Sequence, residues 1–153
     1  MEIMSPAFKT GARIPTKFTC EGENVSPALT WRDVPEEAAC LALIVDDPDA
    51  PSGTFTHWVV YNLPTIPESL DEGVSLSERL SEGLREGLNG AGQQGYMGPC
   101  PPRGHGEHRY YFRLYALDQK LALEGRVTRG QLLDVMEGHI IEQAMWMGLY
   151  SRS

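Results

Sequence analysis

The sequence predicts a mainly β protein, a β-sandwich with a few short helices, one of them near the C-terminus. Apolar, β-prone runs stand at residues 40–47, 56–64 and 109–118, and 16 Gly and 11 Pro place turns between them. Only the segment that follows Thr128 has clear helical periodicity. Because 153 residues suit one hydrophobic core, we expect a single domain over residues 1–153.

Each expected strand has a local reason. Residues 40–47 (CLALIVDD) are a short apolar run that ends at Pro48. Residues 56–64 (THWVVYNLP) form a second run, which Pro64 stops. Residues 109–118 alternate, which predicts a strand with one face made by Tyr110, Phe112, Leu114 and Ala116.

Helices are scarce in the sequence. Thr128 is a suitable N-cap, and Leu132, Met136 and Ile140 repeat at four-residue spacing, which predicts one helix with an apolar face. Residues 75–87 predict at most a short helix, because Gly83 weakens it. Residues 145–153 (MWMGLYSRS) are expected to close the fold as a strand.

Charge and hydropathy exclude several function classes. The formal net charge is -8, from 13 Lys and Arg against 21 Asp and Glu, and no basic cluster could neutralise a nucleic-acid backbone. No apolar stretch approaches the roughly 20 residues that span a bilayer. The N-terminus lacks the basic and apolar regions of a signal peptide. We therefore expect a cytoplasmic protein that binds no nucleic acid and is not integral to a membrane.

The three cysteines, Cys20, Cys40 and Cys100, match neither a disulfide framework nor a zinc-binding pattern. We expect reduced thiols, two of them buried, with a Cys20–Cys40 disulfide as the alternative. Neither a metal nor a cofactor is expected.

Polar side chains gather around two loops rich in Gly and Pro. Asp47 ends the first strand, His57 begins the second, and His108 and Tyr110 share a face at the start of the third. Strand ends are places where loops converge into pockets. Residues 95–106 supply glycines and prolines that can hold backbone N–H groups toward an anion. The sequence therefore predicts a small anion pocket.

Four motifs in this order carry a resemblance to a known family: NVSPALTW, DPDAP, HWVVYNLP and GPCPPRGHGEHRYYF. They resemble the phosphatidylethanolamine-binding protein family, in particular its bacterial and archaeal branch of Raf kinase inhibitor-like proteins. The tail EGHIIEQAMWMGLYSR is similar to the helix and last strand of that branch. The resemblance implies a β-sandwich with a pocket for phosphate, acetate or a phosphorylated head group.

The resemblance also implies the site residues and their support. The ligand-binding residues would be Asp47, His57, Pro101, Pro102, His108 and Tyr110, supported by Trp58, Gly98 and Cys100. It further implies a cis Ala50–Pro51 bond. We expect His57 and His108 to donate N–H bonds, Tyr110 its hydroxyl, and amides near Cys100 to complete the shell, while Asp47 orients an imidazole or a loop amide.

Three alternatives remain open beside this non-catalytic reading. Cys100 could be a nucleophile with a histidine base, although no helix start lowers its pKa. Asp47, His57, His105 and His108 could bind a metal, although His105 is expected to be exposed and His139 to lie on the helix surface. The protein could also be a scaffold, similar to a kinase or protease inhibitor, with a vestigial pocket.

A second copy of the chain is the remaining expected partner. The tail holds an apolar cluster of Met145, Trp146, Met147 and Leu149, which could meet another copy in a homodimer.

Overall fold

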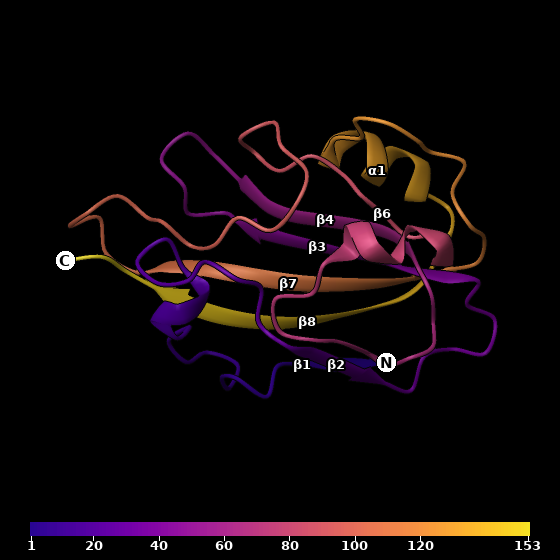
Figure 1. Ribbon diagram of the computed structural model, residues 1–153, viewed down its shortest axis with the longest axis horizontal. Coiled ribbons are helices and arrows are strands. Elements are labelled where there is room, and N and C mark those ends of the chain that lie inside the picture. Colours follow the sequence, from indigo (N-terminus) through magenta and orange to yellow (C-terminus); the bar gives the residue numbers. More distant parts are fainter.

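The computed structural model describes all 153 residues, and its sheets and helix form three layers (Figure 1). The smaller sheet has the order β1-β2-β5, and the larger sheet has the order β6-β4-β3-β7-β8; every pairing is antiparallel. The strands are β1 (Glu2–Met4), β2 (Leu29–Arg32), β3 (Cys40–Asp47), β4 (Phe55–Leu63), β5 (Ser69–Leu70), β6 (Arg85–Glu86), β7 (His108–Leu117) and β8 (Ile140–Tyr150). The α-helix α1 (Arg129–Met136) and the 3-10 helices η1 (Thr16–Phe18) and η2 (Leu76–Glu82) complete the fold. None of these helices has the length and hydropathy needed to cross a membrane. The predicted mainly β sandwich is confirmed.

The larger sheet is buried on both faces. A core of 20 buried residues fills the space between the two sheets, and a second core of 11 lies between the larger sheet and α1. The predicted alternation of β7 is confirmed, because Phe112 and Leu114 face the first core whereas Leu117 faces the second. All eight residues of β3 are buried, which explains why its sequence is an apolar run rather than an alternating pattern.

The helix begins where the sequence predicts and ends earlier. The Thr128 side chain accepts a hydrogen bond from the Gln131 amide at 3.1 Å, and the Gln131 side chain accepts one from the Thr128 amide at 3.0 Å. The helix ends at Met136, and Gly138 has a φ of 84° that a helix cannot continue. Ile140, predicted in the helix, instead begins β8, so the apolar spacing predicted a helix that is one turn too long.

The short helix expected within residues 75–87 is present as a 3-10 helix over residues 76–82, and Gly83 ends it with a φ of 94°. One other local expectation needs correction. The Ala50–Pro51 bond, expected to be cis, is trans; the cis bond of this chain is Ile66–Pro67. The loop between β3 and β4 turns just after Pro51, where the Gly53 amide donates to the Ala50 carbonyl at 3.1 Å and Gly53 has a φ of 106°.

Candidate functional site

A cavity of about 210 Å³ lies at one end of the larger sheet, where the loop from β3 to β4 meets the long loop that precedes β7. In Figure 1 these loops lie at the same end of the molecule as the C-terminus. The cavity is lined by Asp47, Ala50, Pro51, Phe55, His57, Met97, Gly98, Cys100, Pro101, Pro102, His108 and Tyr110. The structure thus brings all six predicted ligand-binding residues around one space.

A β-bulge aims His57 at this cavity. Val45 pairs with Trp58 and Asp46 pairs with Thr56, so His57 is one extra residue in β4. The extra residue allows His57 and Trp58, although adjacent, to turn toward the same face of the sheet. Trp58 does not line the cavity; its ring packs edge-on against Tyr96 at 5.5 Å and so supports the loop behind the cavity wall.

Asp47 orients an imidazole and a loop amide, as the sequence analysis expected of it. One of its carboxylate oxygens accepts the Asp49 amide at 2.7 Å, and the other lies 2.7 Å from Nδ1 of His108. Nε2 of His108 lies 2.6 Å from Nδ1 of His105, a residue on the exposed part of the loop. Both nitrogens of His108 therefore have partners, and His108 cannot donate to a ligand in this arrangement. The expectation that His108 donates directly to the anion is wrong for this state of the site.

His57 keeps one ring nitrogen available. Its Nδ1 lies 2.5 Å from the Met97 carbonyl, which can only accept, so Nδ1 carries the proton. No hydrogen bond within the chain reaches Nε2. Burial lowers the pKa of His57, and the Met97 carbonyl opposes this shift. Sequence reasoning missed Met97, because no pattern links a loop carbonyl to a histidine 40 residues earlier.

Tyr110 supplies a phenol that stays protonated. The side chain is 1% exposed, and its hydroxyl makes no hydrogen bond of normal geometry within the chain, although the Asp47 carboxylate lies near it. Burial, followed by the Asp47 carboxylate, raises the pKa of Tyr110. The ring meets the His57 ring edge-on at 5.3 Å, and the Phe55 ring also meets the His57 ring edge-on, at 5.0 Å. Phe55 is a second residue that the sequence analysis missed, although it lies two residues before His57 on the same strand.

The loop that precedes β7 supplies few amides, because Pro99, Pro101 and Pro102 have none. The Gly98 amide donates to the Asn24 side chain at 2.9 Å, so it is not free for a ligand. The Cys100 amide has no acceptor within the chain, and Cys100 lines the cavity. The Cys100 amide is therefore a potential donor on a residue of the cavity lining.

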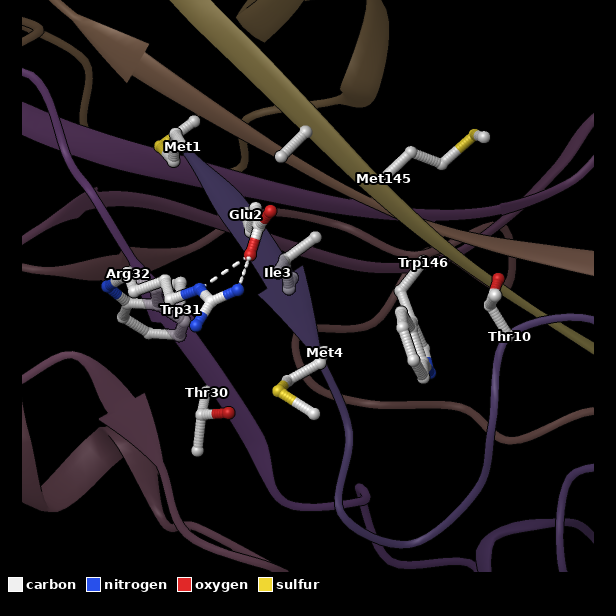
Figure 2. Close-up of a pocket in the computed structure, with 11 residues that line it drawn as sticks. Met1, Glu2, Ile3, Met4, Thr10, Thr30, Trp31, Arg32, Met145 and Trp146 are labelled. Carbon is white, nitrogen blue, oxygen red and sulfur yellow. Dashed lines mark hydrogen bonds and ion pairs between the residues drawn. The ribbon is translucent and has the colours of Figure 1, made fainter.

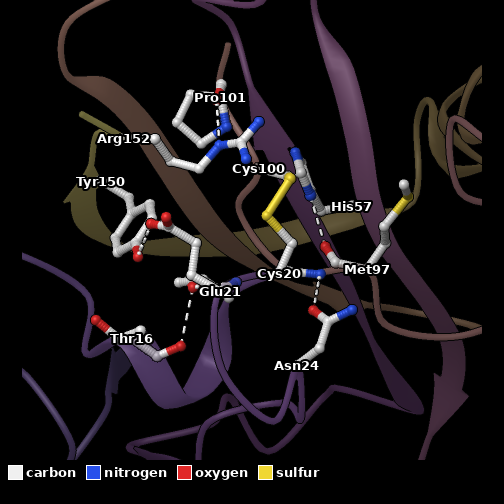
Figure 3. The surroundings of a disulfide bond; sticks show 12 residues. Thr16, Cys20, Glu21, Asn24, His57, Met97, Cys100, Pro101, Tyr150 and Arg152 are labelled. Carbon is white, nitrogen blue, oxygen red and sulfur yellow. Dashed lines mark hydrogen bonds between the residues drawn. A yellow bond between two sulfur atoms is a disulfide. The ribbon is translucent and has the colours of Figure 1, made fainter. Parts of the chain in front are cut away.

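The cysteine expectation is wrong. Cys20 and Cys100 form a disulfide, and Cys40 is the buried free thiol (Figure 3). Both bonded cysteines are exposed loop residues, whereas three reduced thiols, two of them buried, were expected, with Cys20–Cys40 as the alternative pairing. The pairing removes the Cys100 nucleophile on which the enzyme alternative depends.

The residues of the metal alternative do not assemble as ligands. No group of three or more His, Cys, Asp or Glu side chains is arranged to hold a metal ion. His105 is exposed as predicted, and its Nδ1 faces His108 rather than the cavity. His139 lies in the turn after α1, half-buried, with Nδ1 2.9 Å from an Asp118 oxygen.

A larger groove, of about 510 Å³, lies between the edge strands β1 and β8 and contains none of the predicted ligand-binding residues (Figure 2). Its charged side chains, Glu2 and Arg32, pair with each other. Met145 and Trp146 line it, but the predicted tail cluster is split, because Trp146 packs inward on Phe8 while Met145 is 54% exposed. The homodimer stays a prediction.

Comparison with known proteins agrees with this fold. A family model described as phosphatidylethanolamine-binding protein matches residues 4–151. A "UPF0098 protein" of Methanothermobacter thermautotrophicus is 50% identical over 152 residues, which are 99% of each chain. The crystal structure of CT736 from Chlamydia trachomatis, described as a putative homologue of the same family, has a TM-score of 0.91 at 45% identity and covers 99% of this chain and 97% of its own. The structure of E. coli YbcL, described as a member of the mammalian family, has a TM-score of 0.91 at 31% identity, with 99% and 98% covered.

Proposed function

Since the chain belongs to the phosphatidylethanolamine-binding protein family, we propose that it is a non-catalytic protein that binds a small anion or a phosphate-bearing head group in the cavity beside His57. One observation carries this proposal. Nε2 of His57, the Tyr110 hydroxyl and the Cys100 amide all lack partners, and all three residues line one cavity of about 210 Å³. The Tyr110 hydroxyl is buried, and buried polar groups without partners are uncommon in folded proteins. Nε2 of His57 and the Cys100 amide are two further potential donors on residues of the same lining.

The donors act on an anion in different ways. The Tyr110 hydroxyl and the Cys100 amide donate in every state, whereas Nε2 of His57 donates only when the ring is protonated. Asp47 stays beside His108, where it positions the wall of the cavity rather than touching the anion. The remaining lining is largely apolar, with Ala50 and Phe55 among its members, and accepts the uncharged part of a small ligand.

The affinity should be modest. A hydrogen bond to a charged group contributes about 1.5–3 kcal/mol, and association has its own entropic cost. Three such bonds correspond to dissociation constants in the range of about micromolar to millimolar. A free anion and a lipid head group offer the same phosphate, so the experiment must separate them.

The test is an NMR titration that follows the imidazole resonances with inorganic phosphate, phosphoethanolamine and vesicles that contain phosphatidylethanolamine. We expect shifts of the His57 resonances with the two soluble ligands, kept in His139→Gln, which is the matched control on an imidazole far from the cavity. In His57→Ala, we expect the same ligands to cause a smaller shift of the Cys100 amide resonance. If the protein binds the vesicles and neither soluble ligand, the bound phosphate is that of a lipid head group. If no ligand moves the His57 resonances, the anion function is refuted. If His57→Ala binds a protein partner as well as the unmodified chain does, the scaffold alternative is favoured.

A further inference from the structure

The disulfide lies at the wall of the cavity. It joins Cys20, in the loop after η1, to Cys100, in the loop that precedes β7, across 80 residues of sequence. Figure 3 shows the bond beside His57 and Met97. Cys100 lines the cavity and Cys20 does not. The bond therefore reaches the site from outside and ends on a residue of its lining.

Cys100 is the only residue of 99–102 with an N–H group, since its neighbours Pro99, Pro101 and Pro102 have none. That N–H has no partner within the chain. A disulfide restrains both the side chain and the backbone of the residues that it joins, so the direction of this amide depends on Cys20.

Hydrogen bonds hold the loop on both sides of Cys100, and one of them acts together with the disulfide on the Cys100 amide. Before it, the Pro99 carbonyl accepts the Cys20 amide at 3.1 Å, and the Tyr96 hydroxyl donates to the Phe18 carbonyl at 2.7 Å. After it, the Pro101 carbonyl accepts Nε of Arg152 at 2.7 Å. Since the Pro99 carbonyl and the Cys100 N–H belong to one planar peptide group, Cys20 restrains this amide twice, through its own N–H and through the disulfide. The loop can thus stay in place when the disulfide opens, while the Cys100 amide loses one of these two restraints.

We propose that the Cys20–Cys100 disulfide positions the Cys100 amide for the bound anion, so that opening the disulfide weakens anion binding without unfolding the protein. This inference rests on the proposed function, because it concerns the affinity of that same cavity. It makes the anion affinity responsive to thiol–disulfide exchange.

The chemistry is accessible to a dithiol. Cys20 and Cys100 are exposed, so a thiolate of dithiothreitol can attack the bond and form a mixed disulfide, and its second thiol then releases the protein. The two protein sulfurs end as thiols, and the two electrons come from the dithiol, which ends as a cyclic disulfide. Cys40 is buried, and burial raises its pKa to about 11, so it does not take part.

The experiment measures phosphate affinity by calorimetry and follows the amide resonance of Cys100 in three proteins: the oxidised chain, the chain reduced with dithiothreitol, and Cys20→Ser. Cys20→Ser leaves the cavity lining unchanged, and Cys40→Ser is the control for loss of a thiol. We expect binding to weaken roughly tenfold in the two opened forms, near the lower end of the contribution of one hydrogen bond to a charged group. Reoxidation should restore it, and the His57 resonances should still shift at higher phosphate concentration.

Hydrogen exchange of the oxidised chain gives a measurement that needs no variant. Phosphate should slow exchange of the Cys100 amide, and the absence of this protection would overturn the inference even if Cys20→Ser failed to fold. Equal affinity and an equal amide shift in oxidised and reduced protein would also overturn it. If the oxidised chain binds no phosphate at all, the proposed function has failed instead.

Discussion

Protonation of His57 should control how tightly the cavity binds an anion. Nδ1 is committed to the Met97 carbonyl, so Nε2 must gain a proton before it can donate to an anion. Burial lowers the pKa of His57 in the unliganded protein, which means that the ring is neutral at physiological pH. Binding must therefore take up a proton, and affinity is high at low pH and falls as pH rises through the lowered pKa.

The size of this effect follows from linkage. An ordinary histidine titrates near pH 6.5, and His57 titrates below that value, so its ring is deprotonated throughout the range from about pH 6.5 to about pH 8.5. If only the protonated ring binds, each pH unit above the pKa reduces the affinity tenfold, or about 1.4 kcal/mol, and two units reduce it about 100-fold. The contribution of His57 to the stability of the unliganded protein depends on pH in the opposite direction to the anion affinity. A lowered folded pKa favours the neutral ring, so this contribution is lost as pH falls through the folded pKa.

Calorimetry with sulfate is the suitable assay, because sulfate does not titrate in this range and every proton taken up belongs to the protein. Titrations in two buffers of different ionisation enthalpy should give an uptake close to one proton at neutral pH. His108 and His105 are further imidazoles beside the site, so the matched variant is His57→Gln, whose side-chain amide donates at every pH. An affinity of the unmodified protein that is independent of pH, or a slope that persists in His57→Gln, would refute the assignment of the proton to His57.

Three further predictions concern the residues around the site. In Arg129→Met, the carboxylate of Asp46, which is 1% exposed, loses a 2.9 Å bond, and we expect the free energy of unfolding to fall by about 2 kcal/mol at neutral pH. Burial raises the pKa of Asp46, so the loss of unfolding free energy in Arg129→Met should be smaller in acid, where the carboxyl is protonated. Urea denaturation at two pH values tests this, and an equal loss at both pH values would contradict it. Gly98→Ala would place a Cβ 2.3 Å from the Phe18 carbonyl oxygen and should destabilise the protein by about 1–3 kcal/mol, so an unchanged thermal midpoint would count against the packing described. Asp47→Asn should lower the free energy of unfolding by about 1.5–3 kcal/mol, because it removes the charge from the buried 2.7 Å hydrogen bond between Asp47 and His108. Urea denaturation measures this loss, and an unchanged free energy of unfolding would contradict the prediction.

Local chemistry made several features readable from the sequence. The apolar run of β3, the stop of β4 near Pro64 and the capping by Thr128 depend on residues within a few positions of each other. The overrun of the helix to Ile140 has the same origin, because the four-residue spacing continues past the glycine that ends the helix. Periodicity reports which face is apolar and does not report where hydrogen bonding stops.

The candidate site could be predicted only as a set of residues. That Asp47, His57 and Tyr110 stand at strand ends follows from the order of the strands, and the antiparallel sheet then places those ends around one cavity. The bulge that aims His57 depends on the register between β3 and β4, which the sequence of either strand does not specify.

The sequence by itself determined the mainly β class, the family resemblance and the identity of the polar residues at one end of the sheet. Only the tertiary structure decided that Cys20 pairs with Cys100, that His108 has both nitrogens occupied and that His57 has one nitrogen free. The physical reason is that hydrogen-bond and sulfur partners are chosen by distance in space. The partners here come from loops up to 80 residues apart, and the packing of the two sheets brings those loops together.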